Sequence, residues 1–183
     1  MKKTCISSIL LLLVLVVSYT PETKAASQNE CAIWLCLPTG FPSGCSSAKS
    51  AFKKRIKKGK SPLPSLGSCI VSSPIPIGDE SEMSSQDGIA AYIPEHQECL
   101  LWKTRRVNSR RDETYCAQEI TVPTKVQRDT TCHISRNRDG ETSKSTPAFC
   151  TQTIRYVDVY VDGVPIGPTY YFDGNGNEFQ IPE

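Results

Sequence analysis

The chain has 183 residues, of which 38% are hydrophobic, and it carries 21 lysines and arginines against 19 aspartates and glutamates. This near balance is not the strongly basic composition typical of proteins that bind nucleic acid over a broad surface. A chain of this length buries one modest hydrophobic core or two small ones.

Residues 1–25 have the pattern of a secretory signal peptide. Lys2 and Lys3 precede an unbroken run of nine apolar residues, Ile9 to Val17, and Thr23-Lys24-Ala25 forms a small-x-small cleavage site. The apolar run is shorter than the ~20 residues that a membrane span needs. We therefore expect cleavage after Ala25 and export to the periplasm or the medium, with an uncleaved anchor as the alternative.

Cleavage after Ala25 would change both the charge and the number of cysteines. It would remove three basic and one acidic residue from the 21 and 19, leaving 18 of each in a neutral product, and it would leave eight of the nine cysteines. An even number of cysteines in an exported chain predicts disulfides, here as many as four. Zinc is the competing use of clustered cysteines, but the chain has no C-x-x-C pair, so we expect neither a metal nor another cofactor.

Residues 26–72 are predicted to form a helical hairpin with four cysteines. Ala32 to Leu37 is apolar and long enough for a short helix, and a turn rich in proline and glycine follows it. A second helix is expected from Ser43 to Gly59, because apolar residues recur there at helical spacing: Cys45, Ala48, Phe52 and Ile56.

The hairpin geometry favours nested disulfides. Cys36 and Cys45 flank the turn, while Cys31 and Cys69 lie farther from it. We prefer the pairs Cys36–Cys45 and Cys31–Cys69. The crossed pairs, Cys31–Cys45 and Cys36–Cys69, remain open because the sequence alone does not fix connectivity.

This region also resembles a known family. Its E-C-A-I-x-L-C-L opening, the P-S-x-C after the turn and the fourth cysteine after a basic helix are similar to the TrbM/KikA family over residues 30–71. Members of that family are exported accessory proteins of bacterial conjugation. The resemblance implies a role in mating-pair formation or type IV secretion, partners among the envelope proteins of that apparatus, and no catalytic residues.

The second predicted helix carries the densest run of positive charge: Lys53, Lys54, Arg55, Lys57, Lys58 and Lys60. Such a run could contact an anionic lipid or an anionic envelope polymer. The alternative is a solvated helix face without a ligand. No aromatic residue is interleaved with the basic ones, so we do not expect binding of single-stranded nucleic acid by stacking.

The rest of the chain is predicted to be a connector and a second stapled unit. Residues 73–98 are acidic and rich in proline, and we expect them to be exposed, except for the apolar patch Ile89 to Ile93, which could dock on a neighbouring core. Residues 99–183 hold the other four cysteines and end in a β meander, because residues 153–161 alternate with period two. We expect Leu100, Leu101 and Trp102 to lie in the core of this unit and its cysteines to pair among themselves: Cys99, Cys116, Cys132 and Cys150. The predicted fold class is therefore α+β.

The sequence offers little for catalysis. Neither of the two histidines, His96 and His133, belongs to a recognisable nucleophile, metal or acid–base motif. We expect a protein that is not an enzyme, has no small-molecule substrate and acts by protein or envelope contacts in conjugation. The alternatives are a secreted binding, inhibitor or toxin-like module unrelated to conjugation, and a cell-wall hydrolase that uses a pair of carboxylates.

Overall fold

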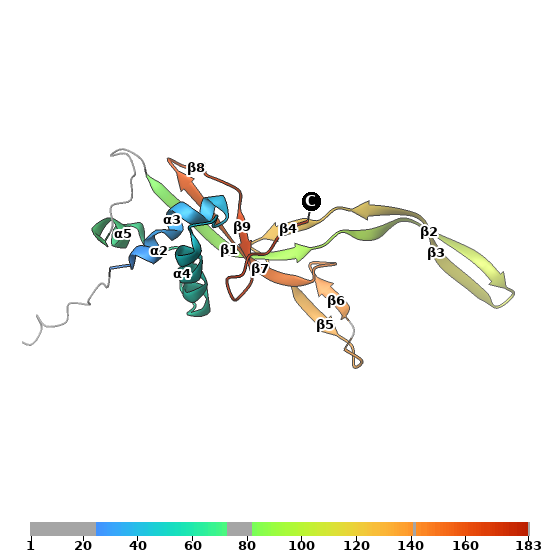
Figure 1. The fold of residues 1–183 in the computed structure, drawn as a ribbon. Helices are drawn as coiled ribbons and strands as arrows, with labels where there is room; N and C mark the ends of the chain where they lie inside the picture. The colour runs from blue at the N-terminus through green and yellow to red at the C-terminus, as the bar shows by residue number, and fades with distance from the viewer. Residues whose placement is uncertain (1–24, 73–81, 141, 183) are drawn as a thin grey trace, which may run out of the picture.

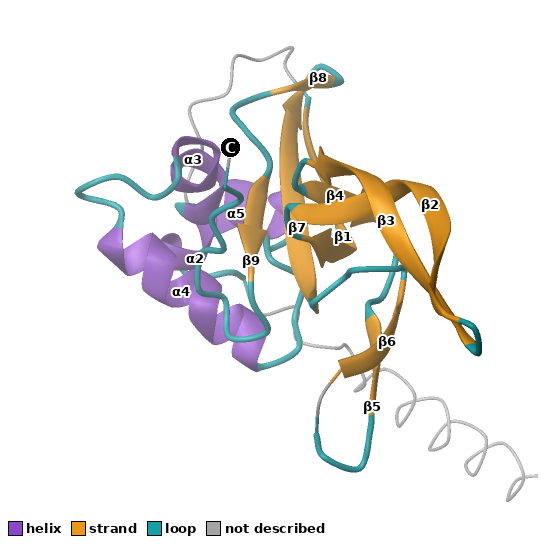
Figure 2. Ribbon diagram, turned by 90° about the vertical axis from the view of Figure 1, so that its right-hand side faces the viewer, coloured by secondary structure: helices purple, strands orange, loops and turns teal. Residues whose placement is uncertain are grey.

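The computed structural model describes residues 25–72, 82–140 and 142–182. The expected signal peptide lies outside the described residues except for Ala25. The fold is α+β, as predicted: short helices cover one side of an antiparallel sheet, and two β-hairpins project from the other side (Figures 1 and 2). No helix in the described ranges is long and apolar enough to cross a membrane.

The helices come first along the chain and the strands follow. The helical elements are α2 (Gln28–Cys31), α3 (Ile33–Cys36), the 3₁₀ helix η2 (Leu37–Thr39), α4 (Ser46–Lys57) and α5 (Leu66–Ser72). The strands are β1 (Met83–Ile93), β2 (His96–Asn108), β3 (Arg111–Val122), β4 (Lys125–Arg128), β5 (His133–Arg136), β6 (Thr142–Thr146), β7 (Gln152–Val161), β8 (Val164–Pro165) and β9 (Tyr170–Phe172).

Strand β7 is the centre of the main sheet. It pairs with β1 from Met83↔Val161 to Tyr92↔Gln152, and β8 and β9 pair with its opposite edge. Strand β4 pairs with the last four residues of β1, on the edge of β1 that faces away from β7. All of these pairings are antiparallel.

Much of the expected connector, residues 73–98, is part of this sheet. Residues 83–93 form β1, and β2 begins at His96. The first half of β1 has exposed polar side chains and shows no apolar alternation, so its strand structure comes from pairing with β7. The expectation of a connector without regular structure is wrong for these residues, whereas the expected exposure holds for Ser84 to Asp87 and the expected docking for Ala90 to Ile93. Residues 73–81 lie outside the described part of the chain.

The helices and the sheet share one hydrophobic core. The predicted alternation of β7 is present: Val157 and Val159 pack with Phe52 and Ile33 of the helical layer. On the opposite face of the sheet, Tyr156 belongs to a smaller apolar cluster. The hairpin 26–72 and the unit 99–183 are thus joined by packing, whereas we expected two separately stapled units.

The two disulfides of the helical layer have the nested pairing preferred from the sequence. Cys31 pairs with Cys69 and Cys36 with Cys45, with Cα–Cα distances of 5.4 and 5.9 Å. Helix α4 begins at Ser46 and not at Ser43, because the turn continues through Gly44, whose φ is 98°. Its end agrees with the prediction, since Gly59 follows it with φ of 66°.

Phe52 tests whether the helices and the sheet unfold together. Its side chain is fully buried, and its ring lies 5.0 Å from the ring of Phe172 in β9. We expect Phe52→Ala to lower the free energy of unfolding by about 3–5 kcal/mol, because a large cavity opens between the two layers. Chemical denaturation followed by circular dichroism measures this change.

The matched control is Leu35→Ala, which truncates an exposed side chain of α3. We expect it to change the free energy of unfolding by less than about 0.5 kcal/mol. Separate melting of the helices and the sheet in the Phe52→Ala variant would contradict a shared core.

Candidate binding surfaces

Strands β2 and β3 form a long hairpin that extends away from the body of the protein (Figure 1). We call residues 96–122 the arm. Its two strands pair with each other from His96↔Val122 to Asn108↔Arg111, as a sheet separate from the main one. A two-stranded ribbon has no second layer against which to bury side chains, and such ribbons are marginally stable alone.

A disulfide closes the arm where its ladder is irregular. Two of the three register shifts in the arm lie here, and they leave Leu100 of β2 and Ala117 of β3 without cross-strand partners. Cys99 and Cys116 are bonded beside these two bulges, with their Cα atoms 5.7 Å apart. Bulges weaken pairing and increase twist, so a covalent link at this place fixes the register that hydrogen bonds alone would hold less well.

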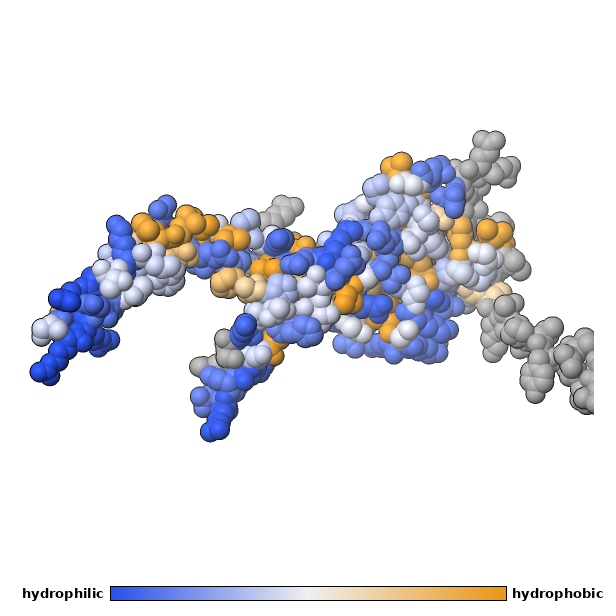
Figure 3. Space-filling model, turned by 180° about the vertical axis from the view of Figure 1, so that it is seen from behind, coloured by the Kyte–Doolittle hydropathy of each residue, from blue (hydrophilic) through white to orange (hydrophobic). Residues whose placement is uncertain are grey.

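Large apolar side chains are exposed along the arm. Trp102 is 63% exposed and Leu100 is 58% exposed, so the expectation that Leu100, Leu101 and Trp102 form a core is wrong. Figure 3 shows hydrophobic residues gathered near the base of the arm and hydrophilic ones at its tip. We call the exposed apolar set the arm patch; its members are Leu100, Leu101, Trp102, Val107, Tyr115 and Ile120.

The tip of the arm is basic. Arg105 pairs with Glu113 and Arg106 with Asp112 across the two strands, at 2.8 and 3.3 Å. Within the described residues, no acidic side chain pairs with the other three basic residues of the tip, which are Lys103, Arg110 and Arg111. The exposed pairs add little stability, so the charges serve solubility or recognition.

His96 anchors the base of the arm. Its ring nitrogens lie 2.8 Å from the carbonyl oxygen of Pro94 and 3.0 Å from a carboxylate oxygen of Glu98. The ring also stacks on Phe149, at a centroid distance of 4.0 Å, next to the second projecting hairpin, β5–β6. The Pro94 carbonyl and, to a smaller extent, Glu98 raise the pKa of His96, because both accept hydrogen bonds from the protonated ring.

The second projecting hairpin is also stapled at its base. Cys132 and Cys150 are bonded, and Cys150 packs against Ala91 and Ile93 of β1. All four C-terminal cysteines therefore pair among themselves, as we expected. Four disulfides are typical of a protein exported to an oxidising compartment.

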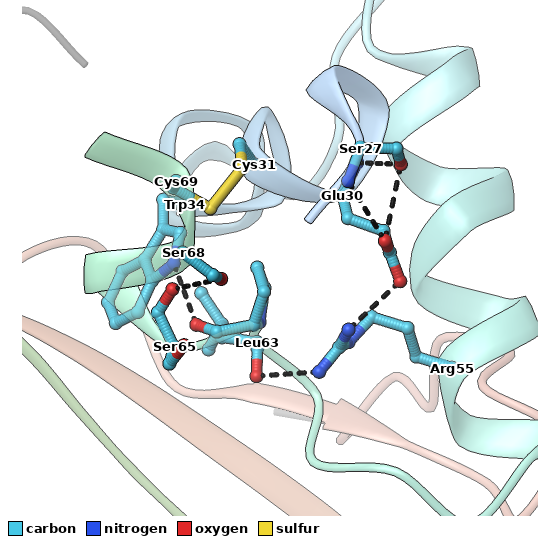
Figure 4. Close-up of a disulfide and its surroundings, with 10 residues drawn as sticks. Ser27, Glu30, Cys31, Trp34, Arg55, Leu63, Ser65, Ser68 and Cys69 are labelled. Atoms are coloured by element: carbon cyan, nitrogen blue, oxygen red, sulfur yellow. Dashed lines mark hydrogen bonds and ion pairs between the residues drawn. A yellow bond between two sulfur atoms is a disulfide. The ribbon is translucent and has the colours of Figure 1, made fainter. Parts of the chain in front are cut away.

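The six basic residues between Lys53 and Lys60, four of them in α4 and two just after it, do not form one surface. Arg55 is nearly buried and donates to Glu30 of α2 at 2.9 Å, as Figure 4 shows. It also donates to the carbonyl oxygens of Ser61 and Leu63, both at 3.0 Å. Arg55 is therefore a structural link between α2, α4 and the segment after α4, and the interpretation as a surface contact is wrong for this residue.

The other five basic residues lie on different sides of α4. Lys54, Lys58 and Lys60 line a cleft between α2 and α4 together with Arg55. Lys53 lies beside the C-terminal turn, where its Cα atom is close to Gly176, and Lys57 is exposed. Of these five lysines, three therefore line the cleft, and the other two lie at separate positions outside it.

Glu30 is the acidic residue that the sequence analysis did not identify. Its carboxylate accepts from the backbone N–H of Ser27 in a capping box and from Arg55. Partial burial alone would raise the pKa of Glu30, but the Ser27 N–H and the Arg55 guanidinium together lower it. The pattern S-x-x-E at residues 27–30 is the signal that could have predicted this cap.

A buried ion pair on the opposite face of the sheet was also not predicted. Asp158 of β7 is only 7% exposed, and its carboxylate accepts two hydrogen bonds from Arg128 of β4, at 2.7 and 3.3 Å. Thr169 donates to the same carboxylate at 2.6 Å. These contacts satisfy the buried charge and join β4, β7 and the segment before β9, which is a structural role.

Potential metal ligands and the two histidines lie apart from one another in the described part of the chain. No three or more histidine, cysteine, aspartate or glutamate side chains gather there as metal ligands would. His96 is bound to Glu98 at the base of the arm, while His133 is exposed on β5, away from a base or nucleophile motif. The arm patch and the cleft beside α4 are two surfaces that the structure offers for binding, and smaller pockets lie beside the β5–β6 hairpin and beside β9.

Comparison with known proteins finds no matching family model, no matching curated protein and no matching solved structure.

The role of Arg55 can be separated from that of its neighbours. We expect Arg55→Gln to lower the free energy of unfolding by about 1–3 kcal/mol, because Glu30 and two carbonyl groups lose a partly buried partner. Lys57→Gln removes the same charge from an exposed position of the same helix and should change stability by less than about 0.5 kcal/mol. Equal melting temperatures of the two variants would show that the Arg55 contacts are not structural.

His96 should make stability depend on pH. Its pKa in the folded protein is raised above the unfolded value, so the protonated ring stabilises the fold below about pH 6.5. This contribution is lost as the pH rises through the folded-state pKa. We expect an NMR titration of His96 to give a higher midpoint in the folded protein than in urea, and His96→Gln to destabilise the protein more at acidic than at alkaline pH. A lower midpoint in the folded protein would contradict the assigned hydrogen bonds.

Proposed function

We propose that this protein is an exported, disulfide-stabilised accessory protein of bacterial conjugative DNA transfer, which acts without catalysis by binding another envelope protein through its arm. The observation that carries the binding role is the arm patch on a projecting, covalently closed hairpin. Export, the binding mode and the conjugative role rest on separate observations.

The composition and placement of the arm patch favour a protein partner. Aromatic residues and arginine are enriched at the centres of protein interfaces. Here Trp102 lies on one face of the ribbon, and Tyr115 and Arg105 lie on the other. The Arg105 guanidinium lies 5.4 Å from the centroid of the Tyr115 ring. Exposed apolar side chains on a ribbon without its own core bury little surface within the fold, and such a group is typical of a site for contact with another protein.

The closed arm is also suited to binding because it is held in one register before it meets a partner. The disulfide between Cys99 and Cys116 limits the conformations of the ribbon where the bulges weaken its ladder. A preorganised binding element loses less conformational entropy on association than a free loop does. This supports recognition of a folded partner through a fixed shape.

Export is supported by the four disulfides together with the signal-peptide pattern of residues 1–25. We place the mature protein in the periplasm. The resemblance of residues 30–71 to the TrbM/KikA family supports the assignment to conjugation, and it makes the envelope proteins of the mating apparatus the partners.

Trp102→Ala tests the arm within the whole protein. We expect it to lower the frequency of plasmid transfer about tenfold or more when it replaces the wild-type gene in the donor, because a central aromatic anchor is lost from the interface. Val164→Ala is the matched control, since it truncates another strongly exposed apolar side chain, in β8 and outside the arm. Melting temperatures of both variants, measured on purified protein, should equal that of the wild type.

Two results would contradict parts of this proposal. Unchanged transfer after deletion of the gene would contradict the conjugative role, and an effect of the secreted protein on target-cell growth or protease activity would then favour the inhibitor or toxin-like alternative. Loss of transfer on deletion with normal transfer in Trp102→Ala would place the partner contact elsewhere on the molecule.

A further inference from the structure

The cleft between α2 and α4 is a second surface, independent of the arm. Its volume is about 660 Å³, which is in the range of cavities that hold small ligands. Ser27, Asn29 and Glu30 line it from α2 and its cap, and α4 forms the other wall. Figure 4 shows Glu30 and Arg55 reaching toward each other across the two helices, so this pair fixes the spacing of the walls.

The cleft has a net positive charge that nothing in the described protein compensates. Glu30 is the acid in the lining, and Arg55 already neutralises it. Within the described ranges, no acidic side chain pairs with the three lysines of the lining, which are Lys54, Lys58 and Lys60. Lys54 lies in α4 and Lys58 is its C-cap residue, four positions later, so their like charges repel each other at the end of the helix. A bound anion would relieve this repulsion.

The remaining lining groups are small and polar. Ser47 and Ser50 lie on α4 at helical spacing from Lys54 and Lys58, so a row of hydroxyls continues into a row of ammonium groups. Ala51 is the one apolar side chain of the lining, and no aromatic residue contributes to it. A base or another flat aromatic ligand would have no surface on which to stack, whereas a hydroxylated ligand finds donors and acceptors along the wall.

We propose that this cleft binds the phosphate ester of a polyol, with the phosphate held by Lys54, Lys58 and Lys60 and the polyol hydroxyls by the serines of α4. Lysine ammonium groups bind phosphate as point charges, without the planar geometry that an arginine fork requires. The same chemistry is offered by a free polyol phosphate and by the headgroup of phosphatidylglycerol. The site lies on the helical layer, so it goes beyond the role proposed for the arm.

Two double variants provide the test, because each removes two positive charges four residues apart at the C-terminal end of α4. Lys54→Gln with Lys58→Gln alters the cleft, and Lys53→Gln with Lys57→Gln alters positions outside it. Calorimetric titration of the full mature protein with glycerol 3-phosphate should show binding that the cleft variant weakens about tenfold or more and that the control variant changes less than about twofold. Circular dichroism should show that both variants remain folded.

A second probe distinguishes the sources of the ligand. Co-sedimentation with phosphatidylglycerol vesicles, compared with phosphatidylcholine vesicles, should show cleft-dependent binding if a lipid headgroup is the ligand, and none if the ligand is soluble. Equal weakening by the two double variants, or no binding of either probe by the wild type, would overturn the proposal.

The contribution of the hydroxyls is tested separately. Ser47→Ala with Ser50→Ala should weaken binding of glycerol 3-phosphate and leave the affinity for inorganic phosphate unchanged. Equal effects on the two ligands would overturn the assignment of the polyol. Trp102→Ala, which concerns the arm, should leave these titrations unchanged, so a failure of this site is distinguishable from a failure of the arm.

Discussion

The packing of Phe52 against the aromatic side chains of the C-terminal strand holds the molecule together. Its ring lies 5.5 Å from that of Phe41, 5.6 Å from that of Tyr170 and 5.0 Å from that of Phe172. Edge and tilted arrangements of this kind stabilise aromatic clusters beyond their buried area. Residues from the two ends of the described chain thus meet in one cluster, and α4 is fixed on the sheet.

This cluster also determines what the opposite side of α4 can do. Because Phe52 and Ile56 face the sheet, Lys54 and Lys58 must face away from it and toward α2. This dense packing leaves the hydroxyl group of Tyr170 buried without a hydrogen-bond partner among the described residues, which is unfavourable. The same burial raises the pKa of Tyr170. The apolar gain around the ring offsets that loss.

The parts of the fold that could be predicted from the sequence are those with a strong local signal. The helical spacing of α4, its glycine stop and the period-two pattern of β7 all reflect burial of one face, and burial is visible in composition. The turn between the two predicted helices favoured the nested disulfides, which the structure has, but it left the crossed pairs open. The arm could not be recognised, because Leu100, Leu101 and Trp102 look the same in sequence whether they enter a core or an interface.

Long-range pairing explains the other differences. The first half of β1 is polar and becomes a strand only because β7 lies beside it, 70 residues or more farther along the chain. Arg55 could not be separated from the five lysines around it, because its burial depends on Glu30 and on carbonyl groups that the fold brings near. The basic residues form one continuous run in the sequence, but the folded protein places them on different surfaces.

The arm is held together by contacts within itself, and this affects how its length can change during evolution. Its disulfide joins two residues of the arm, and its first and last residues, His96 and Val122, are paired neighbours at the body. Two residues added to each strand at paired positions would lengthen the ribbon while each existing side chain kept its face. Reach toward a partner can thus evolve by small insertions near the tip, without any compensating substitution in the globular body.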